Sequence, residues 1–379
     1  MKIGILGGTF NPIHKGHIEI AKTACENLGL GKVIFIPNGI PPHKKSSSIS
    51  NEDKLNMLNI SLLNYPQFFV DTFEIDKNDT SYLYLTLEYL RKKYPFDELY
   101  FIAGSDNIDK ISGWKNPEEL FKYANFVFVK RPEYELDKNI IKNLEETYNA
   151  NISVIDFYGI DISSSCIREA FENFIKVEDK LPSGVFSYIA EHAVYPYTKI
   201  NKLKEKLDDK RFIHSKNVAF EAYKLAKVYN EDCEKAYYAG LLHDCAKKID
   251  LDEQLDLINK FNTYPLMENE LSYPKVLHAL TGSIIAKREF NVSDREILDA
   301  IRFHTLGNKN MTLLSKIIYI ADLISSDRLY KGVEILREMA YNNIDKAILM
   351  SIENTVSYLG EDKVQTNVLE LRDYIKENL

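Results

Sequence analysis

The sequence predicts two domains of different fold class: an α/β domain with a doubly wound parallel sheet over residues 1–197, and an all-α domain over residues 198–379. The chain has 379 residues, enough for two or three domains at about 150 residues each. Short β-rich runs alternate with helical stretches in the first half. From about Leu203 onward the strand-like runs disappear and apolar residues recur at helical spacing. The segment from Tyr195 to Lys202 is the expected boundary.

The first domain owes its predicted sheet to short apolar runs. Five of them are expected to be strands: Lys2–Leu6, Val33–Ile36, Leu99–Ile102, Phe126–Val129 and Val154–Phe157. The runs are nearly continuous, as expected for parallel strands that helices cover on both faces. Pro37 is expected to stop the second strand. Helical patterns fall between the strands, for example His17–Asn27 and Ser81–Lys93.

The second domain owes its predicted helices to apolar residues at a spacing of three and four. The clearest stretches are Val218–Tyr229, Lys235–Lys247 and Met311–Ile324. In the last of these, five side chains form one apolar stripe: Leu314, Ile317, Ile318, Ala321 and Ile324.

Composition and charge exclude several classes of protein. Hydrophobic residues make up 45% and charged residues 27%, ordinary values for a globular protein. The net charge of −8 disfavours wrapping a nucleic-acid backbone or coating an anionic membrane. No apolar run approaches the 18 or so residues that a membrane span needs. The four cysteines show no C-x-x-C spacing and fit free thiols. We therefore expect a cytoplasmic protein with neither nucleic-acid nor membrane partners, and leave its oligomeric state open.

A glycine- and histidine-containing motif follows the first predicted strand. The run Gly7–His17 reads G-G-T-F-N-P-I-H-K-G-H and opens a helix. Glycines let backbone N–H groups approach a phosphate closely, and a helix N-terminus favours negative charge. His14 and His17 can donate hydrogen bonds to a phosphoryl group whose charge is redistributed during transfer. The motif therefore predicts a phosphate-handling site.

Three further polar elements follow predicted strand ends: Pro41–Lys44, Gly104–Asn107 and Ile162–Arg168. Ser163 is expected to cap the helix that carries Arg168. In an open α/β sheet, ligands bind outside the carboxyl ends of the strands, so these elements are expected to converge on one pocket. Lys44 and Arg168 would then supply fixed positive charge for a triphosphate.

These motifs resemble the nucleotidyltransferase superfamily that carries H-x-G-H, and within it the bacterial nicotinate-nucleotide adenylyltransferases. The likeness covers about residues 1–195 and extends to Gly113-Trp-Lys and Lys130-Arg-Pro. It implies a Rossmann-like domain that transfers AMP from ATP, with its Mg²⁺, to nicotinate mononucleotide. The products would be deamido-NAD (nicotinate adenine dinucleotide) and pyrophosphate, a step of NAD biosynthesis.

The resemblance also implies roles for individual residues. His14, His17, Lys44 and Arg168 would hold the ATP phosphates, Asp106 would lie near the ATP ribose, and Trp114 by the nicotinate ring. The other residues expected at the ATP and substrate site are Gly7, Gly8, Thr9, Phe10, Asn11, Gly104, Arg131, Ser163 and Ser164. No protein nucleophile is expected, because the substrate phosphate attacks the α-phosphorus in line.

The chain departs from this family at three positions. Asn11 stands where Asp is usual, Ser165 where Thr is usual, and Leu83 where a Ser-Tyr-Thr run usually ends. Leu83 removes one polar contact near the nicotinate. A different substrate, such as phosphopantetheine or a sugar-alcohol phosphate with another nucleotide, is an alternative, although the P-P-H-K and I-S-S-x-x-I-R runs favour nicotinate mononucleotide.

Histidines and aspartates recur on the apolar helices of the second domain. His243-Asp244 lies in an apolar run, where a buried carboxylate needs a partner or a metal. The remaining candidates, each near an apolar helix, are His214, His278, His304 and Asp322. Six nitrogen and oxygen ligands that include a bridging carboxylate suit a two-metal centre. Histidine with carboxylate favours Fe, Mn, Zn or Co.

The order of these ligands resembles the HD-domain phosphohydrolases, most closely the bacterial symmetrical diadenosine tetraphosphatases. The likeness covers about residues 205–379 and includes Gly240–Asp244, Ala300–Thr305 and Lys316–Asp322. It implies a di-iron site and hydrolysis of diadenosine tetraphosphate, a dinucleoside polyphosphate, to two ADP by a metal-activated water. Lys247 and Arg302 could help to bind the phosphates.

The sequence thus predicts a bifunctional enzyme. In one alternative the helical domain acts on another nucleotide, and in another it serves as a sensing or assembly module. The presence of all six predicted ligands favours a hydrolase. Among the eight histidines, His43 flanks Lys44 and His192 has no predicted role.

Overall fold

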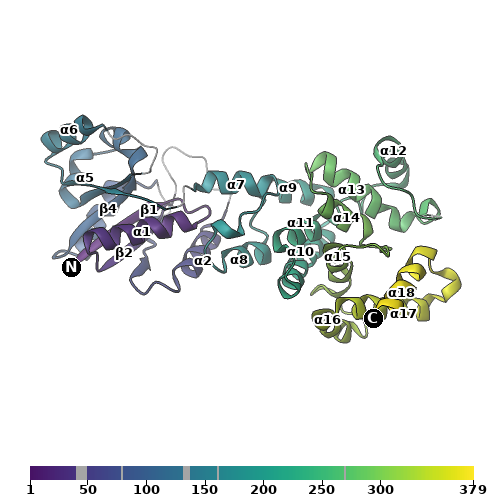
Figure 1. The fold of residues 1–379 in the computed structure, drawn as a ribbon. Helices are drawn as coiled ribbons and strands as arrows, with labels where there is room; N and C mark the ends of the chain where they lie inside the picture. The colour runs from purple at the N-terminus through teal and green to yellow at the C-terminus, as the bar shows by residue number, and fades with distance from the viewer. Residues whose placement is uncertain (40–48, 78–79, 131–136, 160–161, 269) are drawn as a thin grey trace. The chain divides into compact units, whose positions relative to one another are not determined.

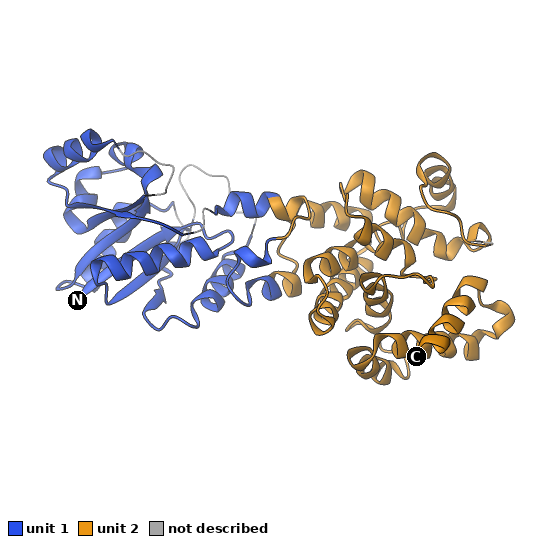
Figure 2. Cartoon of the chain, in the orientation of Figure 1, with its two compact units in different colours: residues 1–169, 177–188 blue, residues 170–176, 189–379 orange. Residues whose placement is uncertain are grey.

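The computed structural model describes residues 1–39, 49–77, 80–130, 137–159, 162–268 and 270–379. The chain divides into two compact units (Figure 2), which we call unit 1 (Met1–Glu169 and Val177–Tyr188) and unit 2 (Ala170–Lys176 and Ile189–Leu379). Unit 1 is an α/β structure and unit 2 is helical, so the predicted fold classes are confirmed.

Unit 1 is built on a parallel sheet with the strand order β3-β2-β1-β4-β5-β6 (Figure 1). The strands are β1 (Lys2–Gly8), β2 (Lys32–Pro37), β3 (Phe68–Val70), β4 (Glu98–Gly104), β5 (Asn125–Lys130) and β6 (Ile152–Asp156). In this register Ile5 lies between Ile34 on β2 and Phe101 on β4. The chain winds outward from β1 in both directions, so the carboxyl ends of β1 and β4 flank the point where the winding reverses. Ligands bind at such points in doubly wound sheets.

Apart from strand ends that are shifted by one or two residues, two details of the sheet differ from the sequence prediction. The short edge strand β3 was not predicted, because three residues are too few to show a strand period. Pro37 belongs to β2, which was expected to stop before it: Pro37 pairs with Gly8, and Asn38 N–H donates to the Gly8 carbonyl at 2.9 Å.

The helices of unit 1 follow the strands. They are α1 (Lys15–Leu28), α2 (Asn51–Leu62), α3 (Phe73–Asp76), α4 (Leu83–Lys93), the 3₁₀ helix η1 (Ser105–Gly113), α5 (Pro117–Tyr123), α6 (Lys138–Tyr148), α7 (Ser164–Glu172), η2 (Glu178–Lys180) and α8 (Val185–His192). The last residues of α7 and of α8 belong to unit 2. One face of the sheet forms a core with α4, η1, α5 and α6, in which Ile5 and Phe101 meet Leu87 and Leu120. Helix α1 packs against β1, β2 and β5. The sheet is therefore a rigid base for the loops at its carboxyl edge.

Unit 2 consists of helices that continue to the C-terminus. They are α9 (Tyr197–Lys206), α10 (Asp209–Tyr229), α11 (Cys233–Leu242), α12 (Leu251–Phe261), η3 (Glu270–Ser272), η4 (Pro274–Val276), α13 (Leu277–Glu289), α14 (Arg295–Phe303), α15 (Leu313–Ile324), α16 (Val333–Asn342), α17 (Ile344–Leu359), η5 (Glu361–Lys363) and α18 (Thr366–Asn378). Helices α10, α11, α14 and α15 pack on one another in its centre. Gly240 lets α10 and α11 approach closely, because a Cβ there would lie 2.7 Å from the Cα of Ala219.

One helix ends earlier than predicted. The apolar pattern predicts a helix over Lys235–Lys247, but α11 ends at Leu242, and turns carry the chain through His243 and Asp244. The pattern fails because the residues after the helix are as buried as those within it, so burial continues where the helical backbone stops.

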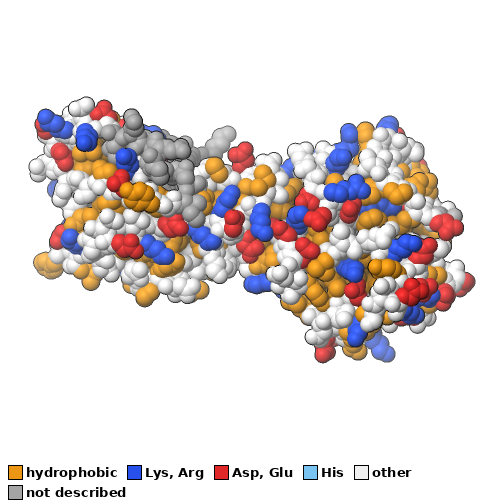
Figure 3. Space-filling view, viewed as in Figure 1, with side chains coloured by type: hydrophobic (Ala, Val, Ile, Leu, Met, Phe, Trp, Pro, Cys, Tyr) orange, Lys and Arg blue, Asp and Glu red, His pale blue; other side chains and the backbone are white. Residues whose placement is uncertain are grey.

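No helix among the described residues is both long and apolar enough to cross a membrane. On the face drawn in Figure 3, basic and acidic side chains are interspersed in each unit. The four cysteines are free thiols, as predicted.

Candidate active sites

The loop between β1 and α1 turns sharply at the carboxyl edge of the sheet. Phe10 has a left-handed backbone with φ of 43°, a conformation that costs free energy for a residue with a side chain. Its ring is fully buried beside Phe35 and edge-on to His17, with ring centroids 5.0 Å apart, and this packing offsets the strain. Gly8 makes room for this ring, since a Cβ there would lie 3.0 Å from it. The loop thus delivers the chain to α1 with its N-terminus at the sheet edge.

His14 and His17 lie together at the start of α1. Their rings stack with centroids 3.7 Å apart, and His14 is the residue that precedes the helix. The backbone N–H of His14 donates to Nδ1 of His17 at 3.2 Å. Because Nδ1 accepts this hydrogen bond, the neutral His17 ring carries its proton on Nε2, where it is a donor. His17 is therefore held in the tautomer that can donate to a phosphate oxygen.

Helix α7 brings a second predicted element to the same loop. The Arg168 guanidinium donates to the carbonyl of Asn11 at 2.6 Å, and the Ser164 hydroxyl donates to the carbonyl of Pro12 at 2.9 Å. Ser163 Oγ accepts from the N–H of Cys166 at 3.2 Å, which confirms it as the N-cap of α7. A cation, the α1 N-terminus and two histidines thus lie around one loop. Together they can bind a polyphosphate.

For the other described residues predicted for this site, the structure gives a position in the fold but no hydrogen bond to the β1–α1 loop. Gly104 ends β4 beside β1, and Asp106 follows it in η1. Trp114 follows η1 and is partly buried, edge-on to Phe101 in the sheet core, with centroids 6.4 Å apart. Lys44 and Arg131 lie outside the described residues.

The six predicted metal ligands of unit 2 come together from separate helices. They are His214 on α10, His243 and Asp244 just after α11, His278 on α13, His304 just after α14 and Asp322 on α15. The ligand atoms of His214, His243 and Asp322 lie within 4.8 Å of one another, and so do those of His243, Asp244 and His304. Asp244 is shared between the two sides: Oδ1 lies 3.2 Å from His278 Nε2, and Oδ2 lies 3.7 Å from His243 Nε2.

All four histidines turn Nε2 toward the centre and hold Nδ1 on a fixed oxygen. Three of them direct Nδ1 to a backbone carbonyl three residues earlier: His243 to Gly240, His278 to Lys275 and His304 to Ile301, at 2.7, 2.9 and 2.7 Å. His214 directs Nδ1 to the Asp327 carboxylate at 2.8 Å. An acceptor at Nδ1 fixes the proton there and leaves the Nε2 lone pair for a metal, the arrangement usual in metal sites.

The centre holds acceptor atoms that need a cation. Nε2 of His278 lies 3.3 Å from Nε2 of His304, and both face Asp244. Because Nδ1 carries the proton in both rings, the Nε2 lone pairs of His278 and His304 face each other and the carboxylate oxygen of Asp244. Nε2 of His243 is buried without a hydrogen-bond partner among the described residues. A buried acceptor such as His243 Nε2 is costly to leave unpaired, and a divalent cation would pair it. The residues present therefore fit a metal centre.

The pKa values agree with this interpretation. Burial lowers the pKa of His243 to about 4, and burial likewise lowers the pKa of His278 to about 4. Both rings are therefore neutral at pH 7, as a metal ligand must be. Burial opposes ionisation of Asp322, but His214 and Arg328 outweigh it and hold the pKa of this carboxyl well below its usual range.

Three charged residues of the centre were not predicted from the sequence. Asp327 orients His214, Arg211 donates to Asp244 Oδ2 at 2.8 Å, and Arg328 donates to Asp322 Oδ1. With Lys247, whose Nζ lies 3.0 Å from His278 Nε2, the two arginines form a partly exposed cationic rim. Arg211 could have been found, because it precedes His214 by three residues and so shares its helix face. The places of Asp327 and Arg328, in a loop after α15, depend on tertiary structure.

Arg302 does not belong to this rim, although it was expected to help bind phosphates. Its guanidinium is almost fully buried and makes two hydrogen bonds of 2.7 Å with the buried Glu270 carboxylate. The pair joins η3 to α14. Arg302 thus has a structural role: it fixes α14, the helix that His304 follows, to η3.

The contact between His214 and Asp327 carries a testable prediction. We expect Asp327→Ala to weaken metal binding by about 10–100-fold, the usual cost of losing such a support. Asp327→Asn, which keeps an acceptor but loses the charge, should fall between this variant and the unaltered protein. The measurement is equilibrium dialysis against Mn²⁺ with metal analysis. Unchanged binding in Asp327→Ala would show that the backbone alone orients His214.

Two family models match the chain in separate parts. The Cytidylyltransferase-like model matches residues 5–170 and the HD domain model matches residues 211–327. The HD match implies binding of divalent metal in unit 2.

Known proteins are similar to the whole chain or to one half of it. A Mycoplasma genitalium protein named "Probable nicotinate-nucleotide adenylyltransferase/Ap4A hydrolase" is 31% identical over 93% of this chain and 97% of its own length. A Clostridium perfringens protein named "Probable nicotinate-nucleotide adenylyltransferase" is 42% identical over 51% of this chain and 98% of its own length. A crystal structure from Clostridium acetobutylicum, described as a predicted HD superfamily hydrolase involved in NAD metabolism, is 40% identical. It covers 49% of this chain and 99% of its own, with a TM-score of 0.46.

Proposed function

Because the chain belongs to the family of nicotinate-nucleotide adenylyltransferase/Ap4A hydrolases, we propose that it is a bifunctional enzyme. Unit 1 transfers AMP from ATP to nicotinate mononucleotide, and unit 2 hydrolyses diadenosine tetraphosphate (Ap4A) to two ADP. The observation that carries this proposal is similarity over both units at once, at 93% of the chain and 97% of the Mycoplasma protein. Each unit supports it with a site of matching chemistry.

In unit 1 the chain acts by binding and by neutralising charge. We propose that the ATP phosphates bind against the β1–α1 loop. His17 Nε2 and the N–H groups at the N-terminus of α1 donate to the phosphate oxygens. Arg168, already fixed on the loop by the Asn11 carbonyl, adds positive charge, and we propose the same for Lys44. These groups stabilise the charge that moves onto pyrophosphate as the nicotinate mononucleotide phosphate attacks the α-phosphorus. ATP brings its Mg²⁺ with it.

In unit 2 we propose that the four histidines, Asp244 and Asp322 hold two divalent metal ions. When bound, such ions act as Lewis acids and lower the pKa of a coordinated water. Asp244 offers one oxygen to each side of the centre. The rim of Arg211, Lys247 and Arg328 can hold the phosphates of a dinucleoside polyphosphate, which carries several negative charges.

Two finer points belong to the same proposal. Histidine with carboxylate favours Fe, Mn, Zn or Co, and we propose iron as the resident metal. The four free thiols fit a reducing compartment, and we propose the cytoplasm. Hydrolysis of another nucleotide by unit 2 stays the alternative.

A panel of substrates tests both activities. We expect pyrophosphate release from ATP to have its highest kcat/KM with nicotinate mononucleotide, compared with nicotinamide mononucleotide and phosphopantetheine. We expect the metal-loaded protein to convert Ap4A to ADP. Chromatography of the reaction mixture measures the ADP formed. A nicotinamide acceptor that worked equally well would contradict the transferase assignment. Absence of bound transition metal from the purified protein at every pH would contradict the hydrolase assignment.

A further inference from the structure

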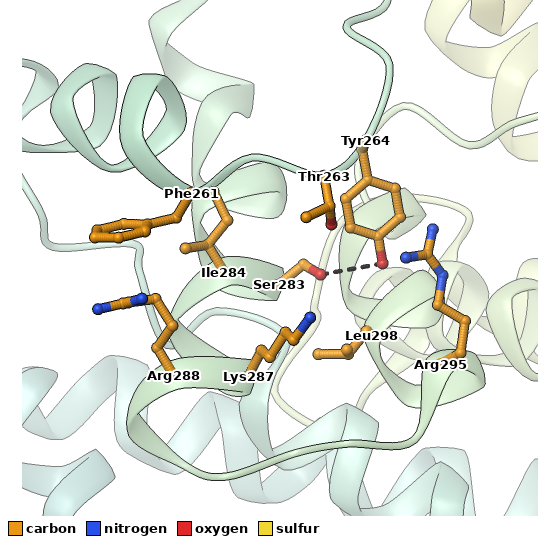
Figure 4. Close-up of a pocket in the computed structure, with 9 residues that line it drawn as sticks. All are labelled: Phe261, Thr263, Tyr264, Ser283, Ile284, Lys287, Arg288, Arg295 and Leu298. Atoms are coloured by element: carbon orange, nitrogen blue, oxygen red, sulfur yellow. Dashed lines mark hydrogen bonds between the residues drawn. The ribbon is translucent and has the colours of Figure 1, made fainter.

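A separate pocket of unit 2 lies between the end of α12, the loop after it, α13 and the start of α14 (Figure 4). Its volume is about 130 Å³. In Figure 4, Lys287 reaches toward the space between Ser283 and Leu298, while Arg288 and Arg295 stand at opposite sides. Neither the transferase site nor the metal centre uses any of these side chains.

The pocket has an excess of positive charge. Lys287 has no carboxylate within 4 Å among the described residues. Arg288 lies over the Phe261 ring at 3.5 Å, and Arg295 pairs with Asp299 at 2.9 Å. Three cations and one carboxylate leave a net charge of +2. An anion is therefore the ligand that the pocket favours.

Hydroxyl groups line the inner wall of the pocket. The buried Ser283 donates to Tyr264 Oη at 3.3 Å, and Tyr264 donates to Asp299 at 2.8 Å. Burial also raises the pKa of Tyr264 to about 12, so the phenol keeps its proton. The Ser283 hydroxyl can rotate from its long hydrogen bond toward a ligand oxygen. The pocket thus offers a hydroxyl donor beneath three cations, the donors that a phosphate group takes.

The pocket is distinct from the metal centre. Lys287 follows His278 by nine residues on α13, and Arg295 precedes His304 by nine residues along α14. Nine residues turn a helix by about 180° from its starting face and advance it by about 13 Å. The cations therefore lie on the side of the α13–α14 pair that faces away from the ligands, at its other end. A ligand of the metal centre would not occupy this pocket.

We propose that this pocket is a second anion site of unit 2, which binds a phosphate group either as inorganic phosphate or as a small phosphomonoester. The volume of about 130 Å³ has room for a phosphate group. The positive charge excludes a cation. The proposal does not depend on the two activities assigned above.

Calorimetric titration of the metal-loaded full chain with inorganic phosphate tests the proposal. The variant is Lys287→Ala/Arg288→Ala. Both side chains are exposed in the unaltered protein, so their removal should keep the fold. We expect it to lose one binding event per chain, or to bind at that site at least about tenfold more weakly, a difference of about 1.4 kcal/mol. Phosphate binding at the transferase site and the metal centre should remain, because neither site is altered.

The matched control is Lys227→Ala/Lys346→Ala, which removes the same charge from exposed positions elsewhere in unit 2. We expect it to titrate like the unaltered protein. Equal isotherms for all three proteins, or an equal loss in the control, would overturn the proposal. Ribose 5-phosphate and AMP as further titrants separate the sources: binding of phosphate alone identifies the free anion, and equal or tighter binding of an ester identifies a phosphomonoester.

Discussion

Replacement of Asp244 by alanine is expected to abolish hydrolysis of Ap4A and to leave adenylyl transfer unchanged. Asp244 is 2% exposed and lies within 4 Å of His243, His278 and His304. It is the only carboxylate among the six predicted ligands that faces both sides of the centre. Its loss would remove an oxygen from both metal positions, and we expect at least about a 10³-fold fall in kcat, since a metal contributes several kcal/mol of charge stabilisation. Metal analysis and the two activity assays on the same sample are the measurement.

Two further variants separate metal binding from folding. Asp244→Asn keeps the shape of the side chain and should bind metal less tightly than the unaltered protein but be folded. Glu221→Gln changes a buried carboxylate that contacts Lys224 and Tyr341, away from the centre, and should keep both metal and hydrolysis. Two metal ions per chain in Asp244→Ala would mean that Asp244 is no ligand. Loss of both activities in a folded Asp244→Ala protein would contradict the assignment of one activity to each unit.

The sequence revealed the ligands of this centre but not their arrangement. Histidine and aspartate next to apolar helical residues are visible in the sequence, because such groups are costly to bury without a partner. All six lie together in the structure. The sequence could not show that His243 and His304 each stand just after the last turn of a helix, which directs Nδ1 back to a carbonyl. Nor could it separate Arg302, buried against Glu270, from the exposed rim arginines.

The sheet of unit 1 shows the same division between local and tertiary information. Five strands are apolar enough to be predicted, whereas Phe68–Val70 is defined by pairing with β2. The Gly7–His17 motif predicted a phosphate site from residue types alone. The motif did not show that the His14 ring stacks on the His17 ring. Nor did it show that Arg168 donates to the Asn11 carbonyl, because these two residues are more than 150 positions apart in the sequence. The ends predicted for the two domains, at 197 and 198, stay a prediction.

Replacement of His17 by alanine is expected to lower kcat for adenylyl transfer by about 10²–10³-fold, the usual cost of removing one donor that stabilises developing charge. Hydrolysis of Ap4A should stay within twofold of the unaltered value. The N–H of His14 donates to Nδ1 of His17, so Nε2 of His17 carries the proton and is the donor. Alanine removes both the Nε2 donor and the Nδ1 acceptor of the His14 N–H. Steady-state pyrophosphate release and the hydrolysis assay measure the two effects.

His17→Gln separates the chemical role of this ring from its structural role. Glutamine at the third position of a helix can accept from the N–H of the residue before the helix, as in a capping box, so it can replace Nδ1 of His17. It cannot also place a donor where Nε2 lies. We therefore expect His17→Gln to recover the thermal stability that His17→Ala loses, about 1 kcal/mol for a lost helix cap, without recovering transfer. His192→Ala, an exposed histidine without a predicted role, is the control and should keep both activities. Recovery of transfer in His17→Gln would mean that His17 acts only by shaping the start of α1.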